Sequence, residues 1–184
     1  MSQKKNGNLR YKTDAETRIA FLLALFWMCV IFAMSAQPGE ESGDLSGGIS
    51  HMVVNLVNTI FSCGWSDTNM LYLAEQWDYP IRKLAHMTEF GVLSLLYLWG
   101  LYARINSSQV NDNLQIFGRM LPLPWIAWGA TVVYASTDEI HQLFVPGRAG
   151  LVTDVLIDSL GAVIALAVWS LCAKIKAKIK AKIK

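Results

Sequence analysis

IAFLLALFWMCVIFAMSA, residues 19–36, is an apolar run that contains no charged residue. Its length is close to the minimum that crosses the hydrocarbon core of a bilayer as a helix. A cleavable secretory signal is the rival interpretation, because small residues such as Ala33 and Ser35 close the run. We favour a membrane span, since the stretch is long for a signal.

The composition of the whole chain agrees with a membrane protein. Hydrophobic residues make up 53% of the 184 residues and charged residues only 16%, whereas a soluble domain carries about 25% charge. Three further apolar segments of sufficient length follow, at about 81–103, 121–144 and 151–173. The sequence therefore predicts an all-α integral membrane bundle of about four transmembrane helices.

A long polar and acidic segment, residues 37–80, separates the first two predicted spans. Within it, the apolar residues of 49–61 recur at helical spacing, which predicts an amphipathic helix in the first extracytoplasmic loop. Such a helix either lies on the membrane surface or packs the loop against the bundle. The sequence leaves these two alternatives open.

The two ends of the chain are basic, which predicts their side of the membrane. Residues 1–18 form a basic N-terminus, and residues 174–184 belong to a Lys-rich tail built on the repeat Ala-Lys-Ile-Lys. Cations gather on the cytoplasmic side of membrane proteins, so we expect a multi-pass protein of the cytoplasmic (inner) membrane with both termini inside. The tail predicts contact with anionic lipids, and no nucleic-acid partner is expected.

With this topology, polar residues from four segments meet at the extracytoplasmic helix ends. On the insertion scale one charge at mid-membrane costs roughly 3 kcal/mol, so such charges must lie near an end or face partners inside the bundle. The residues concerned are Ser35, Gln37, Arg82, Lys83, His86, Glu89, Asp138, Glu139, His141, Gln142, Arg148, Asp154 and Asp158.

Helical spacing groups these side chains further. Arg82, His86 and Glu89 share one helix face. Asp138, His141 and Gln142 share a second face, and Asp154 and Asp158 share a third. Glu139 points about 100° away from Asp138, toward a different neighbour. The turn residues Pro146 and Gly147 are expected to fold Arg148 back over the helix ends.

This set of side chains suits phosphate chemistry. Arg82, Lys83 and Arg148 are candidates to clamp a phosphate or pyrophosphate. His86 and His141 are candidate acid–base or nucleophilic groups, and the carboxylates that would orient them are Glu89, Asp138, Glu139 and Asp154. Ser35, Gln37, Gln142 and Asp158 would support the site. A divalent metal remains an alternative, opposed by the neighbouring cations, and the sequence identifies no cofactor.

The spacing of these residues is similar to that of a known family. The pattern Arg82-Lys83-x-x-His86-x-x-Glu89-Phe90, the segment from Asp138-Glu139-x-His141-Gln142 to Phe144-Val145-Pro146-Gly147-Arg148, and Asp154-x-x-x-Asp158 together resemble the VanZ-like family of bacterial membrane proteins. Ser35-Ala36-Gln37 resembles that family's Ser-Gln element. The resemblance covers about residues 19–172, and it implies a link to low-level resistance against teicoplanin-type glycopeptides.

Two functions follow as hypotheses. The first is an enzyme that acts on a lipid-linked or cell-envelope phosphate substrate, and the second is a non-catalytic protein that binds a cell-wall precursor, a lipid or a glycopeptide. A transporter is disfavoured, because carriers need polar groups near mid-membrane and the segments 93–101 and 160–169 contain no charge.

Overall fold

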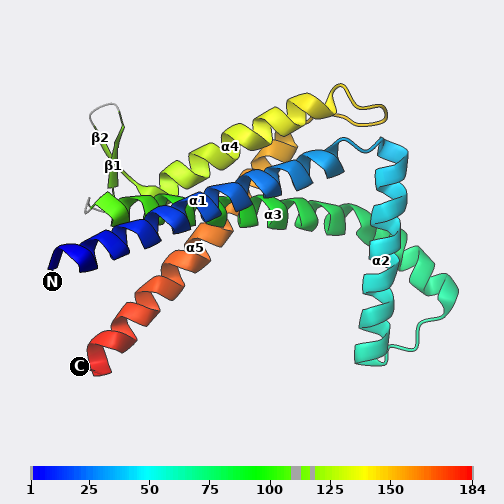
Figure 1. Cartoon of the computed structure of the whole chain (residues 1–184). Coiled ribbons are helices and arrows are strands. Elements are labelled where there is room, and N and C mark those ends of the chain that lie inside the picture. The colour runs from blue at the N-terminus through cyan, green and yellow to red at the C-terminus, as the bar shows by residue number, and fades with distance from the viewer. Residues whose placement is uncertain (1, 109–112, 117–118, 184) are drawn as a thin grey trace.

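The computed structural model describes residues 2–108, 113–116 and 119–183, which form five helices and one small hairpin. The elements in chain order are α1 (Ser2–Ser35), α2 (Gly39–Phe61), α3 (Asp67–Ser108), β1 (Asn113–Ile116), β2 (Arg119–Pro122), α4 (Leu123–Gln142) and α5 (Val152–Ile183). Helices α1, α3, α4 and α5 form a bundle, and α2 runs across one end of it (Figure 1). The predicted all-α membrane bundle is confirmed. The antiparallel hairpin β1–β2, in which Asn113 lies opposite Pro122, is its one addition in the described residues.

Three helical segments are long and apolar enough to cross a membrane: Asp14–Ser35, Asp67–Ile105 and Val152–Ile183. They correspond to three of the four predicted spans. Helix α4 is shorter, with 20 residues, and it is not among the segments that meet this measure in the described part of the chain. It packs against α3 and α5. Its crossing of the membrane therefore stays a prediction.

The helices extend further than their apolar runs. Helix α3 begins at Asp67 and continues through Pro80, so the expected loop over 37–80 is mostly helical. The first turns of α3 run at an angle to the rest of the helix (Figure 1), which agrees with the kink that a proline inside a helix causes. Helix α5 likewise continues through the Lys-rich tail to Ile183.

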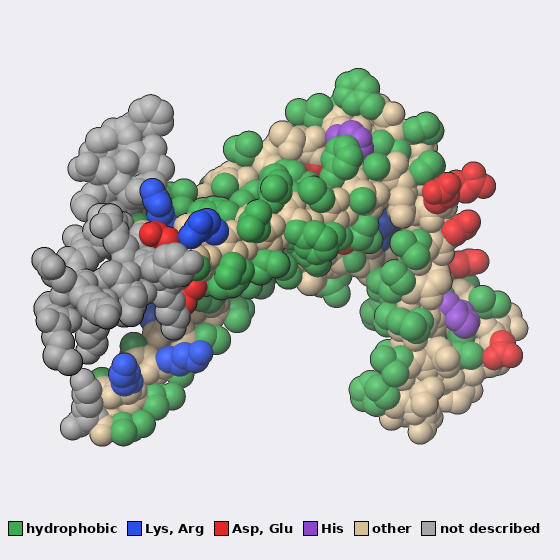
Figure 2. Space-filling model, viewed as in Figure 1, with side chains coloured by type: hydrophobic (Ala, Val, Ile, Leu, Met, Phe, Trp, Pro, Cys, Tyr) green, Lys and Arg blue, Asp and Glu red, His purple; other side chains and the backbone are tan. Residues whose placement is uncertain are grey.

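Helix α2 is amphipathic in an unusual way, because its packed side is small and polar. Ser46, Ser50 and Val54 are its buried residues, and they lie against α3. An exposed apolar stripe recurs at helical spacing beside them, made of Leu45, Ile49, Met52, Leu56 and Ile60. Figure 2 shows apolar side chains on the side of α2 that faces the bundle and acidic ones on its outer side.

The core of the bundle holds two apolar clusters along its length. One is formed by Ala24, Ile31, Phe90, Leu93 and Ala135, and the other by Leu98, Ile105, Leu123, Ala127 and Leu166. The outer faces of the helices expose large apolar side chains, as expected where lipid rather than water surrounds the bundle. The polar residues lie beyond these clusters, at one end of the bundle.

Glycine brings α3 and α5 together just below that polar end. A Cβ atom added at Gly161 would lie 2.2 Å from the carbonyl oxygen of Met87. Gly91 lies at the same crossing, where a Cβ would be 3.3 Å from the carbonyl oxygen of Gly161. Small residues let helix backbones approach closely in membranes, and this approach places the first turns of α5 beside α3.

We predict that Gly161→Ala destabilises the bundle. The added methyl group meets backbone, which cannot rotate away, and overpacking of this kind costs about 1–3 kcal/mol. Thermal unfolding of the purified protein in detergent should shift down by about 2–4 °C per kcal/mol. Gly129→Ala is the matched control, because no atom lies within 4 Å of its added Cβ. Equal unfolding temperatures for the two variants would contradict the proposed role of the crossing.

Candidate functional site

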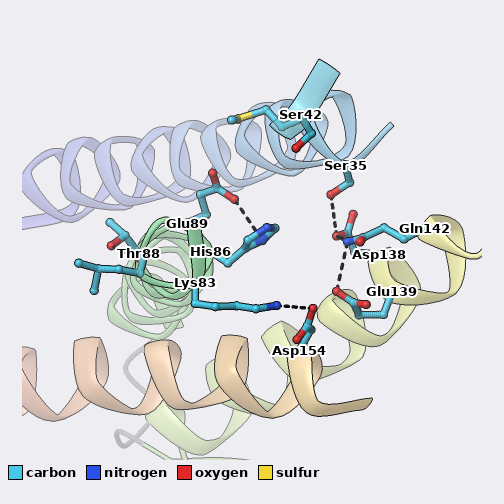
Figure 3. A network of polar contacts seen from close by, with 12 residues as sticks. Ser35, Ser42, Lys83, His86, Thr88, Glu89, Asp138, Glu139, Gln142 and Asp154 are labelled. Carbon is cyan, nitrogen blue, oxygen red and sulfur yellow. Dashed lines mark hydrogen bonds and ion pairs between the residues drawn. The ribbon is translucent and has the colours of Figure 1, made fainter. Parts of the chain in front are cut away.

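The polar residues meet where α1 and α4 end, where α5 begins, and beside the middle of α3 (Figure 3). Ser35 is the last residue of α1. Asp138, Glu139 and Gln142 lie in the last turns of α4, and Asp154 lies in the first turn of α5. The predicted convergence of these segments at one end of the bundle is therefore seen in the structure.

An ion pair joins the two helices that cross at Gly161. The Nζ atom of Lys83 lies 2.5 Å from Oδ2 of Asp154, and the two side chains are only 16% and 17% exposed. A charge in such surroundings is stable only when it is paired. Lys83 is therefore committed to a protein carboxylate rather than free for a ligand, although it is also near the Tyr79 ring, at 5.2 Å from the centroid.

A second polar group ties α1 to α4. The hydroxyl of Ser35 donates to Oδ2 of Asp138 at 2.7 Å. The Nε2 group of Gln142 donates both to Oδ2 of Asp138 and to Oε1 of Glu139, each at 3.1 Å. Oε2 of Glu139 accepts from the backbone N–H of Leu151 at 2.9 Å. Glu139 thus holds the backbone just before α5 begins. Gln142 links the carboxylates of Asp138 and Glu139, although these adjacent residues point in different directions on the helix.

Three carboxylate oxygens at this end are buried without a hydrogen-bond partner in the described part of the chain. They are Oδ1 of Asp138, Oδ1 of Asp154 and Oδ1 of Asp158. Buried polar atoms nearly always have a partner in the protein or in ordered water. These oxygens leave acceptor capacity for a proton, a water or a ligand donor inside the cluster.

His86 and Glu89 face a pocket between α1, α2 and α3. Nδ1 of His86 lies 3.8 Å from Oε2 of Glu89, which is too long for a hydrogen bond but needs only a small movement to become one. The pocket has a volume of about 80 Å³. Its remaining lining residues are Met34, Gln37, Ser42, Leu45, Ser46, Ile49, Ile81, Arg82, Ala85 and Arg148.

Arg148 folds back over the end of α1, as its place after the turn predicts. Its guanidinium donates to the carbonyl oxygens of Gln37 and Met34, each at 3.2 Å, and to the hydroxyl of Ser42 at 2.8 Å. Burial lowers the pKa of Arg148, and the Arg82 cation lowers that pKa further. The ordinary value of 12.5 is high enough that arginine keeps its charge in proteins.

Glycines make this fold-back possible. Gly147 has a positive φ of 72°, which few residues other than glycine adopt. The backbone N–H of Gly39 donates to the carbonyl of Pro146 at 3.0 Å, and a Cβ on Gly39 would lie 2.1 Å from the carbonyl oxygen of Gly147. The loop between α4 and α5 is thus fastened to the start of α2.

His141 lies apart from the pocket. Its ring stacks on Phe32 of α1, with 4.3 Å between ring centroids, and its Nδ1 atom is buried without a hydrogen-bond partner in the described residues. Helical spacing predicts that His141 shares a face with Asp138 and Gln142. The inward face of α4 instead runs through Asp138, Gln142 and Glu139, which leaves His141 to one side.

Two participants were missed by the sequence reasoning. Asp78 pairs with Arg82 across one helical turn, with 3.3 Å between Nη2 and Oδ2, and it also accepts from the Ser50 hydroxyl at 3.3 Å. The i, i+4 spacing of Asp78 and Arg82 was a usable signal. Ser42, by contrast, reaches Arg148 only because of the tertiary fold. Gln37 holds Arg148 through its backbone carbonyl, not its side chain.

No group of three or more His, Cys, Asp and Glu side chains is placed to hold a metal ion among the described residues. Lys83 pairs with Asp154 across α3 and α5, whereas Arg82 pairs with Asp78 within α3. The arrangement can therefore bind a polar group through arginine N–H donors and transfer a proton at His86.

Comparison with protein families places this chain in context. A family model described as VanZ/LLP1 matches residues 20–173. Neither the curated proteins nor the solved structures contain a significant match to the chain.

We predict that Lys83→Met destabilises the protein more than the double variant Lys83→Met/Asp154→Leu. Removal of one partner leaves a buried, unpaired carboxylate, which costs about 3–5 kcal/mol, whereas apolar replacement of both partners is often neutral. Thermal unfolding in detergent compares the two variants with the unaltered protein. A double variant that is less stable than Lys83→Met would show that the pair is not the interaction joining these helices.

Proposed function

The chain belongs to the VanZ/LLP1 family, and from this premise we propose that it acts on a phosphate-bearing substrate that is lipid-linked or part of the cell envelope. The protein is a membrane protein by its family and its apolar helices. In our proposal it spans the cytoplasmic membrane several times with both termini in the cytoplasm, which follows from the cations at the two ends of the chain. The polar end of the bundle then lies on the extracytoplasmic side.

The observation that carries the proposal is the mixed lining of the pocket at His86. Its lining combines the apolar side chains of Met34, Leu45 and Ile49 with the cations Arg82 and Arg148 and with His86 and Glu89. A lipid phosphate offers both kinds of partner, because an apolar chain is attached to an anionic head. The pocket volume of about 80 Å³ is far below the several hundred Å³ typical of drug-sized ligands, which favours a small phosphate group over an enclosed glycopeptide.

The two arginines have donors to spare for an anion. The hydrogen bonds of Arg148 use three of the five N–H groups of its guanidinium, and the bond to Asp78 uses one of those of Arg82. Arginine can bind phosphate through two parallel N–H groups, and Arg82 retains such a pair, whereas Arg148 offers the N–H groups of its Nη1 atom. In the proposed complex, Arg82 and Arg148 hold the phosphate while Lys83 keeps its structural pairing with Asp154.

His86 is the proposed proton-transferring group. Glu89 would accept a hydrogen bond from Nδ1 of His86 after a small movement, which fixes the tautomer and leaves Nε2 to exchange a proton with the substrate. Asp138, Glu139 and Asp154 hold the helix ends in place around this histidine, with Ser35, Gln142 and Asp158 in support. His141 takes no part in this scheme, because it packs on Phe32.

The position of α2 suits a substrate that stays in the bilayer. Its apolar stripe, from Leu45 to Ile60, is exposed, so in our proposal the helix rests with this face in the membrane interface. Leu45 and Ile49 belong both to this stripe and to the pocket lining. A lipid head could therefore reach His86 from the side while its chain remains in the membrane.

A second function is favoured by one feature of the same site. The cations already have protein partners, and His86 and Glu89 are 3.8 Å apart, which also suits a non-catalytic protein that holds a cell-wall precursor, a lipid or a glycopeptide. The link to teicoplanin-type resistance rests on the family resemblance, and either function is compatible with it.

We predict that His86→Gln abolishes turnover while His141→Gln preserves it. Loss of general acid–base catalysis should lower the rate by at least about 100-fold, and the ring of His141 lies outside the pocket. The measurement is mass spectrometry of polyprenyl phosphates and pyrophosphates incubated with protein in lipid nanodiscs. Expression and unfolding temperature of both variants serve as controls.

The same assay separates the two functions. If the protein retains the lipid without converting it, the function is binding rather than catalysis. In that case Arg82→Gln should lose the bound lipid, whereas His86→Gln should keep it. A protein that neither converts nor retains these lipids would overturn both.

A further inference from the structure

A groove lies between α4 and α5 at the end of the bundle opposite the polar pocket. It has a volume of about 280 Å³, and its walls include Pro122, Trp125, Trp128, Val163, Leu166 and Ser170. Trp125 and Trp128 meet edge to face, with ring centroids 5.8 Å apart. The groove is thus a long apolar recess with two indole rings on its α4 side.

One wall of the groove carries an unsatisfied donor. Nε1 of Trp128 is buried and has no hydrogen-bond partner in the described residues. A buried indole N–H usually finds an acceptor. An apolar chain alone would leave this donor unpaired, so the groove suits a ligand that offers both an apolar chain and an oxygen acceptor.

The α5 wall of the groove continues into the Lys-rich tail. Val163, Leu166 and Ser170 lie on one face of α5, and Lys174 follows Ser170 by one helical turn, about 6 Å further along the axis. Lys176 lies about 200° around the helix from Lys174 and therefore faces away. Figure 2 shows cationic and apolar side chains next to each other along the free end of α5.

We propose that this groove is a binding site for an anionic phospholipid. One acyl chain lies between the indole rings and Val163 and Leu166, and the phosphate pairs with Lys174. A rotation of the Trp128 ring, whose N–H is buried in the unbound structure, lets that N–H donate to an ester carbonyl. Charge complementarity selects this occupant over a neutral lipid, because the groove leads directly to a cation. Tryptophan is also enriched at the level of the membrane interface, where lipid ester groups lie.

The site is independent of the proposed function. Its residues lie at the start of α4 and in the middle of α5, away from Asp138 and Glu139 at the end of α4 and Asp154 at the start of α5. Lipid binding measured at the groove therefore neither supports nor contradicts the function proposed for the pocket at His86.

The test compares two lysines that share the tail but not the face. Native mass spectrometry of the full-length protein measures retention of phosphatidylglycerol and phosphatidylcholine by the unaltered protein, Lys174→Gln, Lys176→Gln and Trp128→Phe. We expect the unaltered protein to prefer phosphatidylglycerol. Lys174→Gln should weaken its binding about fivefold, and Lys176→Gln should change it by less than twofold.

Trp128→Phe keeps an aromatic ring but removes the N–H group, so it should weaken the binding of both lipids. Equal losses for Lys174→Gln and Lys176→Gln would overturn the proposal in favour of unspecific adsorption to the tail. Equal retention of the two lipids by the unaltered protein would also overturn it, since the groove would then accept any acyl chain or a second copy of this apolar face.

Discussion

The ion pair between Lys83 and Asp154 is the interaction on which the polar end of this protein depends. Both side chains are largely buried, and neither charge is stable in apolar surroundings without the other. The pair forms only because Gly161 lets α5 approach the backbone of α3 at Met87. Backbone packing and charge pairing are thus two parts of one constraint, and together they fix where α5 begins beside α3.

The other contacts at this end follow from that placement. Glu139 accepts from the backbone just before α5, and Gln142 links Glu139 to Asp138, which in turn holds Ser35 of α1. Arg148 completes the closure by binding carbonyls at the end of α1. These contacts join the ends of α1, α4 and α5. His86 lies nearby on α3, and its carboxylate neighbour Glu89 remains just beyond hydrogen-bond distance. A site that holds its scaffold firmly and leaves one histidine free is well suited to a ligand that completes the network.

Much of this arrangement could be predicted from the sequence, because apolar length and helical spacing are local properties. The membrane helices, the convergence of their polar ends and the fold-back of Arg148 all follow from such patterns. The position of His141 outside the pocket could not be predicted in this way. Helical spacing shows which residues share a face, but it does not show which face turns toward the bundle. In α4 the inward direction is set by Gln142, which bridges Asp138 and Glu139, and His141 is left against Phe32. The start of α3 at Asp67 was also missed, since Pro80 suggests a boundary that tertiary packing overrides.

In the proposed topology, the pocket at His86 opens to the extracytoplasmic side of the membrane. Labelling with a membrane-impermeant maleimide in intact cells tests it most directly, with Ala85→Cys introduced into a variant in which Cys29, Cys63 and Cys172 are replaced by serine. Ala85 lines the pocket, and Ala130→Cys, an exposed position in the middle of α4, is the control that faces lipid in the proposed topology. We expect the reagent to label residue 85 but not residue 130. Labelling of residue 85 only after the cells are permeabilised would place the pocket on the cytoplasmic side instead.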